Sequence, residues 1–355
     1  MIPIDRVVLT HVRVPLVEPF RISSGEVAEK DAIVVAVRSE GYTGYGESSP
    51  MAGSFYSADT PERCWEELCA ALERHRDLRE LRVGNFSRAG FETALADIEA
   101  QKAGQPLWKF LGGARGAVES GLAVGLYDTI PQTLRAAERY LAAGYKRVKF
   151  KIQPGRDVGL IREARKAFGD LPMFVDANGA YTLKDLSVFR RLDEFGLMMF
   201  EQPFAGPRLE DHAELQAAVA TPVCLDESLE SVELLERAIS LGSLRIANIK
   251  IQRVGGLDNA KRMHDICERH GIPCWMGTMP ELGIGGAQAA AMAALPNCRF
   301  PTDVEASERW FRDDIVTPPI EVSGGLIELP GAPGLGWRVD ERKLEKYRIV
   351  RREFA

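Results

Sequence analysis

Three short apolar runs each end in a carboxylate: Met173-Phe174-Val175-Asp176, Met198-Met199-Phe200-Glu201 and Val223-Cys224-Leu225-Asp226. The carboxylates are evenly spaced, because 201 − 176 and 226 − 201 both equal 25 residues. A strand, a helix and their turns occupy about 25 to 30 residues in a parallel α/β barrel. The spacing therefore predicts that three successive barrel strands end in Asp, Glu and Asp.

A lysine flanks this series on each side: Lys151 lies 25 residues before Asp176, and Lys250 lies 24 residues after Asp226. The carboxyl ends of parallel barrel strands share one rim, where barrel enzymes carry out their chemistry. The pattern therefore predicts a catalytic site in which three carboxylates hold a divalent cation between two amines. The alternative, in which each acid only caps the following helix, does not explain why the lysines keep the same register.

From about residue 118, apolar strand candidates alternate with helical stretches. This alternation favours parallel strands joined by right-handed crossovers. The main competitor is an open doubly wound sheet, but the sequence has no GxGxxG after the early strands and no GxxxxGK[ST] motif. The strand candidates are eight in number, enough to close a barrel: 122–126, 147–152, 172–176, 198–201, 222–226, 246–251, 273–276 and 297–301.

The first part of the chain has a different pattern. Strands are predicted over 4–14 and 31–48, with a turn at Glu40-Gly41, and a helix is predicted to begin at Thr60-Pro61-Glu62. A smaller α+β domain beside the barrel suits a chain of 355 residues. The expected domains are the N-terminal part of this α+β domain over 1–115, the barrel over 116–312, and a segment over 313–355 that returns to the first domain.

The composition excludes several classes of protein. A net charge of −6 gives no sign of a nucleic-acid or membrane partner, and no apolar run approaches the roughly 18 residues of a membrane span. No secretion signal is visible at the N-terminus. The six cysteines form no CxxC pair, which favours reduced thiols in a cytoplasmic protein.

The chemistry of the predicted site follows from its residue types. Asp176, Glu201 and Asp226 are hard oxygen ligands with no His or Cys beside them, so they favour Mg²⁺, or Mn²⁺, over Zn²⁺. Lys149 and Lys151 are two residues apart on one strand and share a face. Two ammonium groups side by side near a divalent cation repel, which is expected to lower their pKa values and to free one amine as a base near neutral pH. The alternative for this Lys-x-Lys pair is a solvated strand end.

Lys250 is expected across the barrel from this pair, with Asn248 two residues before it on the same face. Two amines on opposite sides of a bound substrate can remove a proton and return it from the other face. A divalent cation would stabilise the enediolate that forms when a proton α to a carboxylate leaves. The predicted partner is therefore a small-molecule carboxylate substrate.

At these positions the chain resembles the enolase superfamily, and within it the muconate lactonizing enzyme subgroup. The matching motifs are Lys149-Phe150-Lys151, Asp176-Ala177-Asn178, Glu201-Gln202-Pro203, Leu225-Asp226-Glu227-Ser228, and Asn248-Ile249-Lys250 with Arg253-Val254-Gly255-Gly256-Leu257. The resemblance implies an α/β fold, namely a (β/α)7β modified TIM barrel with an α+β capping domain. It also implies a homo-oligomer, because the family is often oligomeric.

The resemblance further implies roles for individual residues. Asp176, Glu201 and Asp226 would bind Mg²⁺, and Lys151 and Lys250 would be the acid/base pair. Lys149 would orient the substrate carboxylate and tune Lys151. Because no histidine ends a strand candidate, the resemblance does not extend to the mandelate racemase branch.

Substrate choice in this subgroup comes from two capping-domain loops and the last barrel strands. The expected substrate-binding residues are Phe20, Ser24, Tyr56, Asn178, Asn248, Met279, Glu281, Asp303 and Glu305. Pro19-Phe20-Arg21-Ile22-Ser23-Ser24-Gly25 looks like the first loop of o-succinylbenzoate synthases and N-acylamino acid racemases, although Pro280 replaces the usual Leu before Glu281. The aromatic residues among these have packing as their alternative role.

The segment Asp303-Val304-Glu305 is a near match to the Asp-x-Asp by which dipeptide epimerases hold a substrate ammonium group. An anionic pair at the rim would favour a cationic amine and disfavour a succinyl carboxylate. The alternative is that Glu305 pairs with Arg309 or Arg312.

The predicted activity is abstraction of an α-proton from a carboxylate, leading to racemisation or epimerisation of an N-acylated amino acid. Dipeptide epimerisation, dehydration of the o-succinylbenzoate synthase type and muconate-type cycloisomerisation use the same residues and stay open. A non-catalytic metal-binding barrel is the alternative from another class, and it would require a missing base or ligand.

Overall fold

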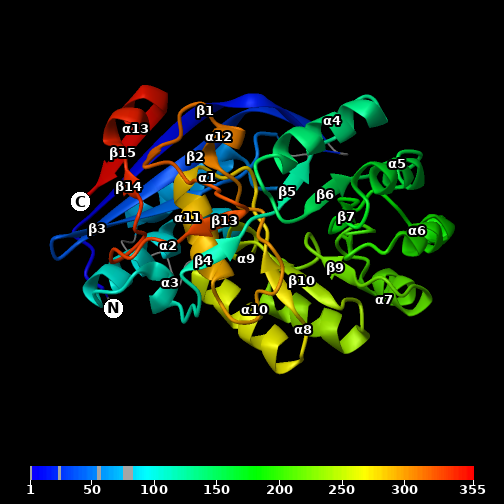
Figure 1. Cartoon of the computed structure of the whole chain (residues 1–355). Helices are drawn as coiled ribbons and strands as arrows, with labels where there is room; N and C mark the ends of the chain where they lie inside the picture. The colour runs from blue at the N-terminus through cyan, green and yellow to red at the C-terminus, as the bar shows by residue number, and fades with distance from the viewer. Residues whose placement is uncertain (1, 23–24, 54–56, 75–82) are drawn as a thin grey trace.

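The computed structural model of the protein describes residues 2–22, 25–53, 57–74 and 83–355. Figure 1 shows a barrel in green to yellow beside a long antiparallel sheet in blue, with the C-terminal helix and strand in red against that sheet. The predicted fold class, a (β/α)7β barrel with an α+β capping domain, is confirmed, since a parallel sheet of seven strands forms the barrel wall beside a separate four-stranded sheet.

The seven parallel strands pair in chain order, β11-β10-β9-β8-β7-β6-β5. They are β5 (Leu122–Val124), β6 (Val148–Lys151), β7 (Met173–Asp176), β8 (Phe200–Glu201), β9 (Val223–Leu225), β10 (Ile246–Ile249) and β11 (Cys274–Met276). Residues 297–303 close the ring: the backbone N of Cys274 donates to Asn297 O (3.1 Å), and that of Gly121 donates to Thr302 O (2.8 Å). The eighth strand predicted over 297–301 is therefore present only as isolated bridges, since this segment forms no regular ladder.

Helices join successive strands and cover the outer face of the barrel, as right-handed crossovers require (Figure 1). They are α4 (Ile130–Leu141), α5 (Val158–Phe168), η1 (Leu183–Asp185), α6 (Leu186–Leu192), η2 (Asp193–Phe195), α7 (Leu209–Ala218), α8 (Val232–Leu241), α9 (Ile251–Val254), α10 (Leu257–Arg269) and α11 (Gly283–Ala293). Local signals set their ends: Thr129 and Gln132 form a capping box before α4, and Gly242 ends α8 with a positive φ of 71°.

The barrel interior is filled by one small apolar cluster: Phe174, Met199, Cys224, Ile246 and Trp275. The alternate positions of the same strands, such as Val175 and Phe200, belong to the larger core under the helices. Lys149 follows the inner set, because its Nζ lies 5.3 Å from the centroid of the Trp275 ring. Phe150 belongs to the outer core, so neighbouring residues of β6 point to opposite faces. All six cysteines are buried and free.

The antiparallel sheet has the order β15-β1-β2-β3. Its strands are β1 (Arg6–Ile22), β2 (Gly25–Ser39), β3 (Tyr42–Ser48) and β15 (Arg348–Phe354), and the helices beside it are α1 (Pro61–Arg74), α2 (Asn85–Lys102) and α3 (Leu107–Phe110). The predicted hairpin turn is confirmed, with positive φ at both Glu40 and Gly41. Glycine lets α2 lie directly on β3, because a Cβ at Gly46 would sit 1.9 Å from Gly90 O. The strand predicted over 4–14 is longer than expected, since β1 and β2 pair as far as Ile22.

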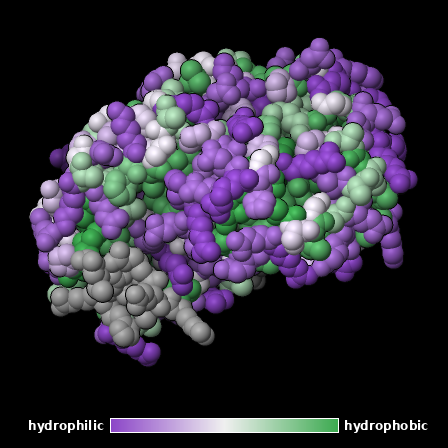
Figure 2. Space-filling view, turned by 90° about the horizontal axis from the view of Figure 1, so that it is seen from below, coloured by the Kyte–Doolittle hydropathy of each residue, from purple (hydrophilic) through white to green (hydrophobic). Residues whose placement is uncertain are grey.

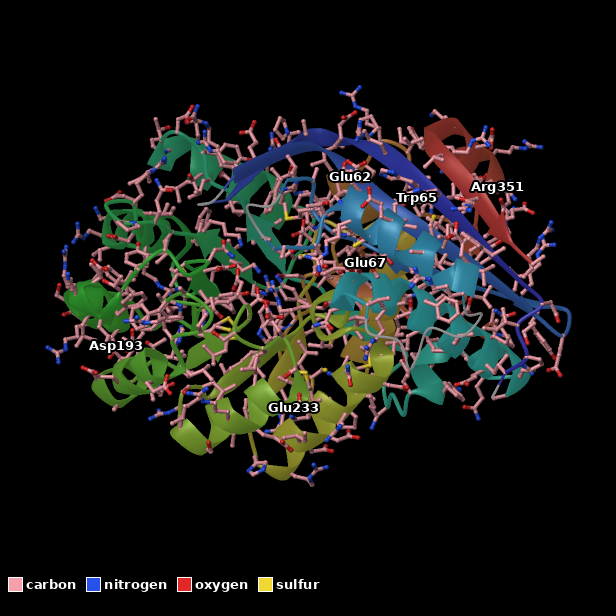
Figure 3. The ribbon with its side chains drawn as sticks, turned by 180° about the vertical axis from the view of Figure 1, so that it is seen from behind. Glu62, Trp65, Glu67, Asp193, Glu233 and Arg351 are labelled. Atoms are coloured by element: carbon pink, nitrogen blue, oxygen red, sulfur yellow. The ribbon has the colours of Figure 1, made fainter. Side chains whose placement is uncertain are left out.

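The remaining elements follow the barrel or stand at its edges. They are β4 (Ala117–Glu119), α12 (Ser307–Trp310), β12 (Val316–Thr317), β13 (Leu326–Glu328), β14 (Arg338–Val339) and α13 (Glu341–Tyr347). The C-terminal strand β15 pairs with β1, which brings the two ends of the chain together in one sheet. Figure 3, seen from behind, shows Glu62, Trp65 and Glu67 on α1 near the strand that carries Arg351. Asp193 in η2 and Glu233 on α8 lie among the helices that surround the barrel.

Side chains of helix α2 form hydrogen bonds with the segment that follows β10. Glu92 on this helix accepts hydrogen bonds from the backbone N of Leu257 (2.6 Å) and Asp258 (3.0 Å), at the start of α10. Gly256 has a φ of 129°, and a Cβ there would lie 2.3 Å from the Glu92 carboxylate. Asn85 adds a hydrogen bond of 2.6 Å to Arg253 O. These contacts hold the chain just beyond Lys250 in place.

Figure 2 shows, from below, a surface on which hydrophilic side chains alternate with smaller hydrophobic patches. Within the described ranges, no helix is both long enough and apolar enough to span a membrane.

Candidate active site

The five residues predicted at strand ends lie around one rim of the barrel. Lys151 and Asp176 occupy paired positions on β6 and β7, and Asp176 and Glu201 occupy paired positions on β7 and β8. Asp226 directly follows β9, and Lys250 directly follows β10. None of the five is more than 7% exposed. The equal spacing in the sequence has therefore placed these side chains next to one another in a buried site.

Each of the two outer lysines is held by a carboxylate. The Nζ of Lys151 is 2.6 Å from Asp176 Oδ2 and donates a second hydrogen bond to Asn178 Oδ1 at 2.8 Å. The Nζ of Lys250 is 2.7 Å from Asp226 Oδ2. Three strands separate β6 from β10 in the sheet, so the two amines stand on different sides of the rim.

Lys149 occupies the centre of the site. Its Nζ lies 3.4 Å from Glu201 Oε2 and 3.5 Å from Asp176 Oδ2, and it also forms an ion pair with Asp303. Burial by itself would lower the pKa of Lys149, but Asp303, Glu201 and Asp176 outweigh burial and raise it. The carboxylates around Lys149 thus favour its charged form, whereas the expected lowering of its pKa presupposed a divalent cation beside the lysines.

The carboxylates differ in their electrostatic surroundings. Burial and the neighbouring Asp176 raise the pKa of Glu201 above its ordinary range. Burial opposes ionisation of Asp226 as well, but Lys250 and Arg253 lower the pKa of this group to about 2. Asn248, two residues before Lys250, donates a hydrogen bond of 2.8 Å to Glu201 Oε1. Glu201 is thus the carboxylate whose charge is least compensated by the protein.

The three carboxylates fit a hard divalent cation in their chemistry. All their donor atoms are oxygens, which Mg²⁺ prefers. The Oε2 atom of Glu201 is buried and has no hydrogen-bond partner, which indicates room for a ligand that attracts it. The oxygens of Asp176, Glu201 and Asp226, all in described parts of the chain, do not converge within 4.8 Å as one group. The ammonium group of Lys149 lies between two of them instead.

A cavity lies above these residues, between the barrel rim and the antiparallel sheet. Its wall is formed by the three lysines and by residues from both parts of the chain: Lys149, Lys151, Lys250, Phe20, Met51, Ala123, Thr278, Met279, Pro280, Asp303, Glu305 and Trp310. Four of the predicted substrate-binding residues line this cavity: Phe20, Met279, Asp303 and Glu305. Ser24 and Tyr56 lie outside the described residues.

The other predicted substrate-binding residues lie in different places. Asn178 and Asn248 contact Lys151 and Glu201 at the base of the site. Glu281 is half-buried beside a neighbouring cavity that it shares with Met279 and Asp303. The lining of the cavity above the lysines does not include it.

Asp303 and Glu305 each form an ion pair with cations of the protein. Asp303 forms ion pairs with Arg147 and Lys149, all of them nearly inaccessible to solvent. Glu305 accepts a hydrogen bond of 2.7 Å from the backbone N of Ala123 and lies 3.4 Å from Arg309 Nε. The predicted alternative, a pairing of Glu305 with Arg309, is the arrangement that the structure has.

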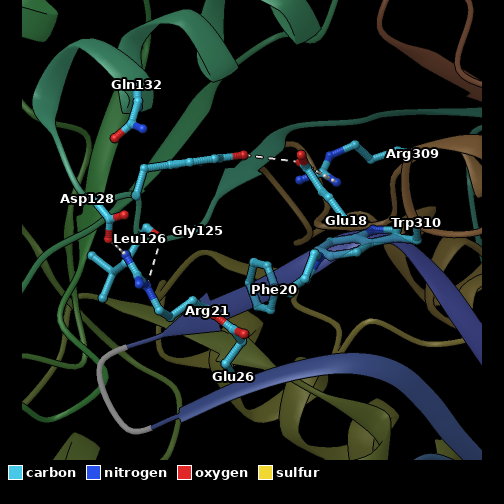
Figure 4. A pocket seen from close by; sticks show the side chains of 12 residues that line it. Glu18, Phe20, Arg21, Glu26, Gly125, Leu126, Asp128, Gln132, Arg309 and Trp310 are labelled. Atoms are coloured by element: carbon cyan, nitrogen blue, oxygen red, sulfur yellow. Dashed lines mark hydrogen bonds and ion pairs between the residues drawn. The ribbon is translucent and has the colours of Figure 1, made fainter.

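A second cavity adjoins the first, and the side chains of Phe20 and Trp310 line both. The two rings pack edge to face, with centroids 5.0 Å apart and an angle of 83° between their planes. Figure 4 shows Arg309 and Glu18 on one side of this cavity and Arg21 with Asp128 on the other. Arg21 donates to Asp128 at 2.7 Å and to Leu126 O at 3.1 Å, which ties the β1–β2 hairpin to the barrel. The hairpin therefore forms a side wall of the site.

Sequence reasoning missed three charged residues of the site. Arg147 is fully buried and pairs with Asp303, Glu227 accepts a hydrogen bond of 2.9 Å from Asn178 Nδ2, and Arg253 Nε lies 3.2 Å from Asp226. Glu227 and Arg253 stood within recognised motifs, so their place in the sequence could have drawn attention to them. Arg147 had only its position two residues before Lys149 as a signal.

Two family models match the chain. Residues 132–343 match the model described as "Enolase C-terminal domain-like", and residues 4–112 match "Mandelate racemase / muconate lactonizing enzyme, N-terminal domain". The o-succinylbenzoate synthase of Geobacillus kaustophilus is 44% identical over 360 residues, covering 98% of this chain and 96% of that protein.

An N-succinylamino acid racemase of Amycolatopsis sp. is 41% identical over 342 residues, covering 92% of this chain and 93% of that protein. Among solved structures, a member of the enolase superfamily from Listeria innocua superposes with a TM-score of 0.94 at 33% identity, covering 100% of this chain and 99% of that one. Similarity thus extends over both the barrel and the antiparallel sheet.

Proposed function

The chain belongs to the mandelate racemase/muconate lactonizing enzyme family of the enolase superfamily and is an enzyme, and on this premise we propose that it racemises N-acylated amino acids. The observation that carries the proposal is the pair of buried amines, Lys151 and Lys250, each placed by its own carboxylate on a different side of the rim. Racemisation needs a base on each face of the α-carbon, and this arrangement supplies two.

In the proposed reaction, the neutral amine of one lysine takes the α-proton from one face of the substrate. The ammonium group of the other lysine then delivers a proton to the opposite face, which inverts the α-carbon. The two lysines exchange roles for the opposite enantiomer. Lys149 keeps its positive charge because carboxylates surround it, and it is proposed to attract the substrate carboxylate.

Asp176, Glu201 and Asp226 are proposed to hold Mg²⁺, with Mn²⁺ as a substitute. When bound, the cation would supply positive charge that stabilises the charge developing on the substrate carboxylate as the α-proton leaves. The same three residues are buried carboxylates, and Oε2 of Glu201 makes no hydrogen bond, which supports this assignment.

A second candidate is dehydration that yields o-succinylbenzoate. It is favoured by the 44% identity to a relative named o-succinylbenzoate synthase. Proton removal from a carboxylate substrate begins both reactions, so the two activities call for the same amines. Dipeptide epimerisation has less support, because Asp303 and Glu305, the proposed ammonium ligands, are already paired with Arg147, Lys149 and Arg309.

The proposal is tested by deuterium incorporation at Cα in heavy water with Mg²⁺, using pure enantiomers of N-succinylamino acids and of dipeptides. Incorporation into N-succinylamino acids with inversion is the expected result. Formation of o-succinylbenzoate from its hydroxylated precursor is measured in parallel. Dehydration without any α-proton exchange would replace the racemase with the second candidate, and exchange confined to dipeptides would contradict both.

A further inference from the structure

We propose that Glu227 is a positioning residue for the amine of Lys151 and acts on it through Asn178. The inference rests on the proposed function, because it concerns the proton transfer assigned there to Lys151. Nothing in the catalytic scheme above uses Glu227, although it directly follows the proposed metal ligand Asp226.

Three side chains form a continuous chain of hydrogen bonds. Lys151 Nζ donates to Asn178 Oδ1 at 2.8 Å, and Asn178 Nδ2 donates to Glu227 Oε1 at 2.9 Å. The amide of Asn178 is thus shared between an ammonium group and a carboxylate. An asparagine amide has an acceptor at one end and donors at the other, so it can bridge these two groups in only one orientation.

The reverse orientation would point the amide NH₂ at the ammonium group of Lys151 and the amide oxygen at the carboxylate of Glu227. Both contacts would be repulsive. Glu227 therefore selects the orientation in which Asn178 offers an acceptor to Lys151. Without a carboxylate or another acceptor at position 227, the amide would lose this preference.

The backbone at Asn178 holds the side chain where this selection matters. Asn178 has a left-handed φ of 44°, which Asn tolerates better than most residues. Its backbone N donates to Asp176 Oδ1 at 2.9 Å, and the backbone N of Gly179 donates to Gln202 O at 2.8 Å. The turn after β7 is thus attached to the residue that follows β8, which fixes the point from which the Asn178 side chain leaves the backbone.

The hydrogen bond from Lys151 to Asn178 differs in its role from the ion pair between Lys151 and Asp176. Asp176 also accepts from Lys151, but it is a proposed metal ligand, so a bound cation would compete for its charge. Asn178 is a neutral acceptor with no such second role. On the other side of the rim, Lys250 has a different support, because Asp226 lies against both Lys250 and Arg253. Glu227 interacts with Lys250 through its charge, but it supplies the acceptor that orients Asn178 toward Lys151. Loss of that acceptor should therefore disturb Lys151 more than Lys250.

The test measures α-proton exchange in heavy water for each enantiomer of an N-succinylamino acid separately. The variants Lys151→Ala and Lys250→Ala first identify which enantiomer depends on which amine. Glu227→Leu, which has no acceptor, is expected to lower the exchange rate of the Lys151-dependent enantiomer about 10- to 100-fold relative to the other. Glu227→Gln keeps an acceptor and is expected to restore most of that ratio.

Three further variants sharpen the test. Asn178→Gly keeps the left-handed backbone and removes the amide, so it should match Glu227→Leu, and the double variant should add little because both act through one contact. Arg253→Gln is the matched control, since it removes a cation beside the carboxylate that holds Lys250. It should shift the ratio of the two exchange rates in the opposite direction.

Equal loss for both enantiomers in Glu227→Leu would overturn the proposal. Loss of Mg²⁺ affinity in both Glu227→Leu and Glu227→Gln would also overturn it, because Glu227 would then be a metal ligand. If the unmodified enzyme exchanges no α-proton in any N-acylated amino acid, the proposed function fails. The role of Glu227 is then tested by comparing crystal structures of the unmodified protein and Glu227→Leu. An Asn178 amide that has turned away from Lys151 in Glu227→Leu supports it, and an unchanged amide refutes it.

Discussion

The ammonium group of Lys149 on β6 forms an ion pair with the carboxylate of Asp303, 154 residues later in the chain. Asp303 also pairs with Arg147 on the same side of the barrel. All three side chains are at most 4% exposed, and Lys149 and Arg147 together lower the pKa of Asp303 against the effect of burial. One carboxylate thus pairs with two buried cations at the point where the barrel closes.

Replacement of Asp303 by Asn is expected to destabilise the fold. Removal of one partner from a buried ion pair typically costs about 3 to 5 kcal/mol, because the other charge is left uncompensated. The free energy of unfolding in urea measures the effect. Glu163→Gln is the control, since Glu163 pairs with Lys166 at 2.8 Å on the surface, where such a pair contributes about 1 kcal/mol or less. Similar losses in both variants would contradict the role of Asp303.

Replacement of either outer lysine should separate the two halves of the proposed reaction. Lys151→Ala and Lys250→Ala are each expected to retain α-proton exchange with one enantiomer only, with a loss of about 10²- to 10⁴-fold for the other. The double variant should exchange neither. Mass spectrometry of the recovered enantiomers in heavy water measures this. Retained exchange in the double variant would show that other groups carry the proton.

Removal of one carboxylate should weaken metal binding without unfolding the chain. Glu201→Gln keeps the volume of the side chain but removes its charge, so its affinity for Mg²⁺ is expected to fall at least about 10-fold. Isothermal titration calorimetry measures the affinity, and circular dichroism monitors the fold. Glu233→Gln, on the outer helix α8 (Figure 3), is the control acid and should bind Mg²⁺ as the unmodified protein does. Equal affinity in the two variants would remove Glu201 from the metal site.

The contact between α2 and α10 should make stability depend on pH. Burial and the neighbouring Asp258 raise the pKa of Glu92 from 4.5 to about 7. Because the folded state holds this proton where the unfolded chain has lost it, the contribution is full below about pH 4.5 and is lost as pH rises through 7. The expected loss is about 3 kcal/mol.

This pH dependence is measured as the difference in unfolding free energy between the unmodified protein and Glu92→Gln. The difference should fall by about 3 kcal/mol between pH 4.5 and 7.5. The exposed Glu62→Gln on α1 is the control and should show no comparable change in this window. A pH-independent difference for Glu92→Gln would mean that folding does not raise the pKa of Glu92.

Much of the fold and the inner ring of the site could be predicted from the sequence alone. The regular spacing of Asp176, Glu201 and Asp226 determined their neighbourhood, because each barrel unit has nearly constant length and each strand ends at the same rim. The two-residue period of a strand placed Lys149 and Lys151 on one face. The prediction of a regular eighth strand was wrong in form. Residues 297–303 occupy its place, but only isolated bridges join them to β11 and to the residues before β5.

Only the tertiary structure decided how the charges of the site are paired. Asn178 and Glu227 are 49 residues apart, and Arg147 and Asp303 are 156 residues apart. No local pattern encodes such contacts, because they depend on which strands meet when the barrel closes and on which way each side chain leaves its turn. The sequence by itself determined which residues reach the rim and offered the local pairing of Glu305 with Arg309. The closed barrel decided that Asp303 pairs with Arg147 and Lys149 and that Asn178 links Glu227 to Lys151.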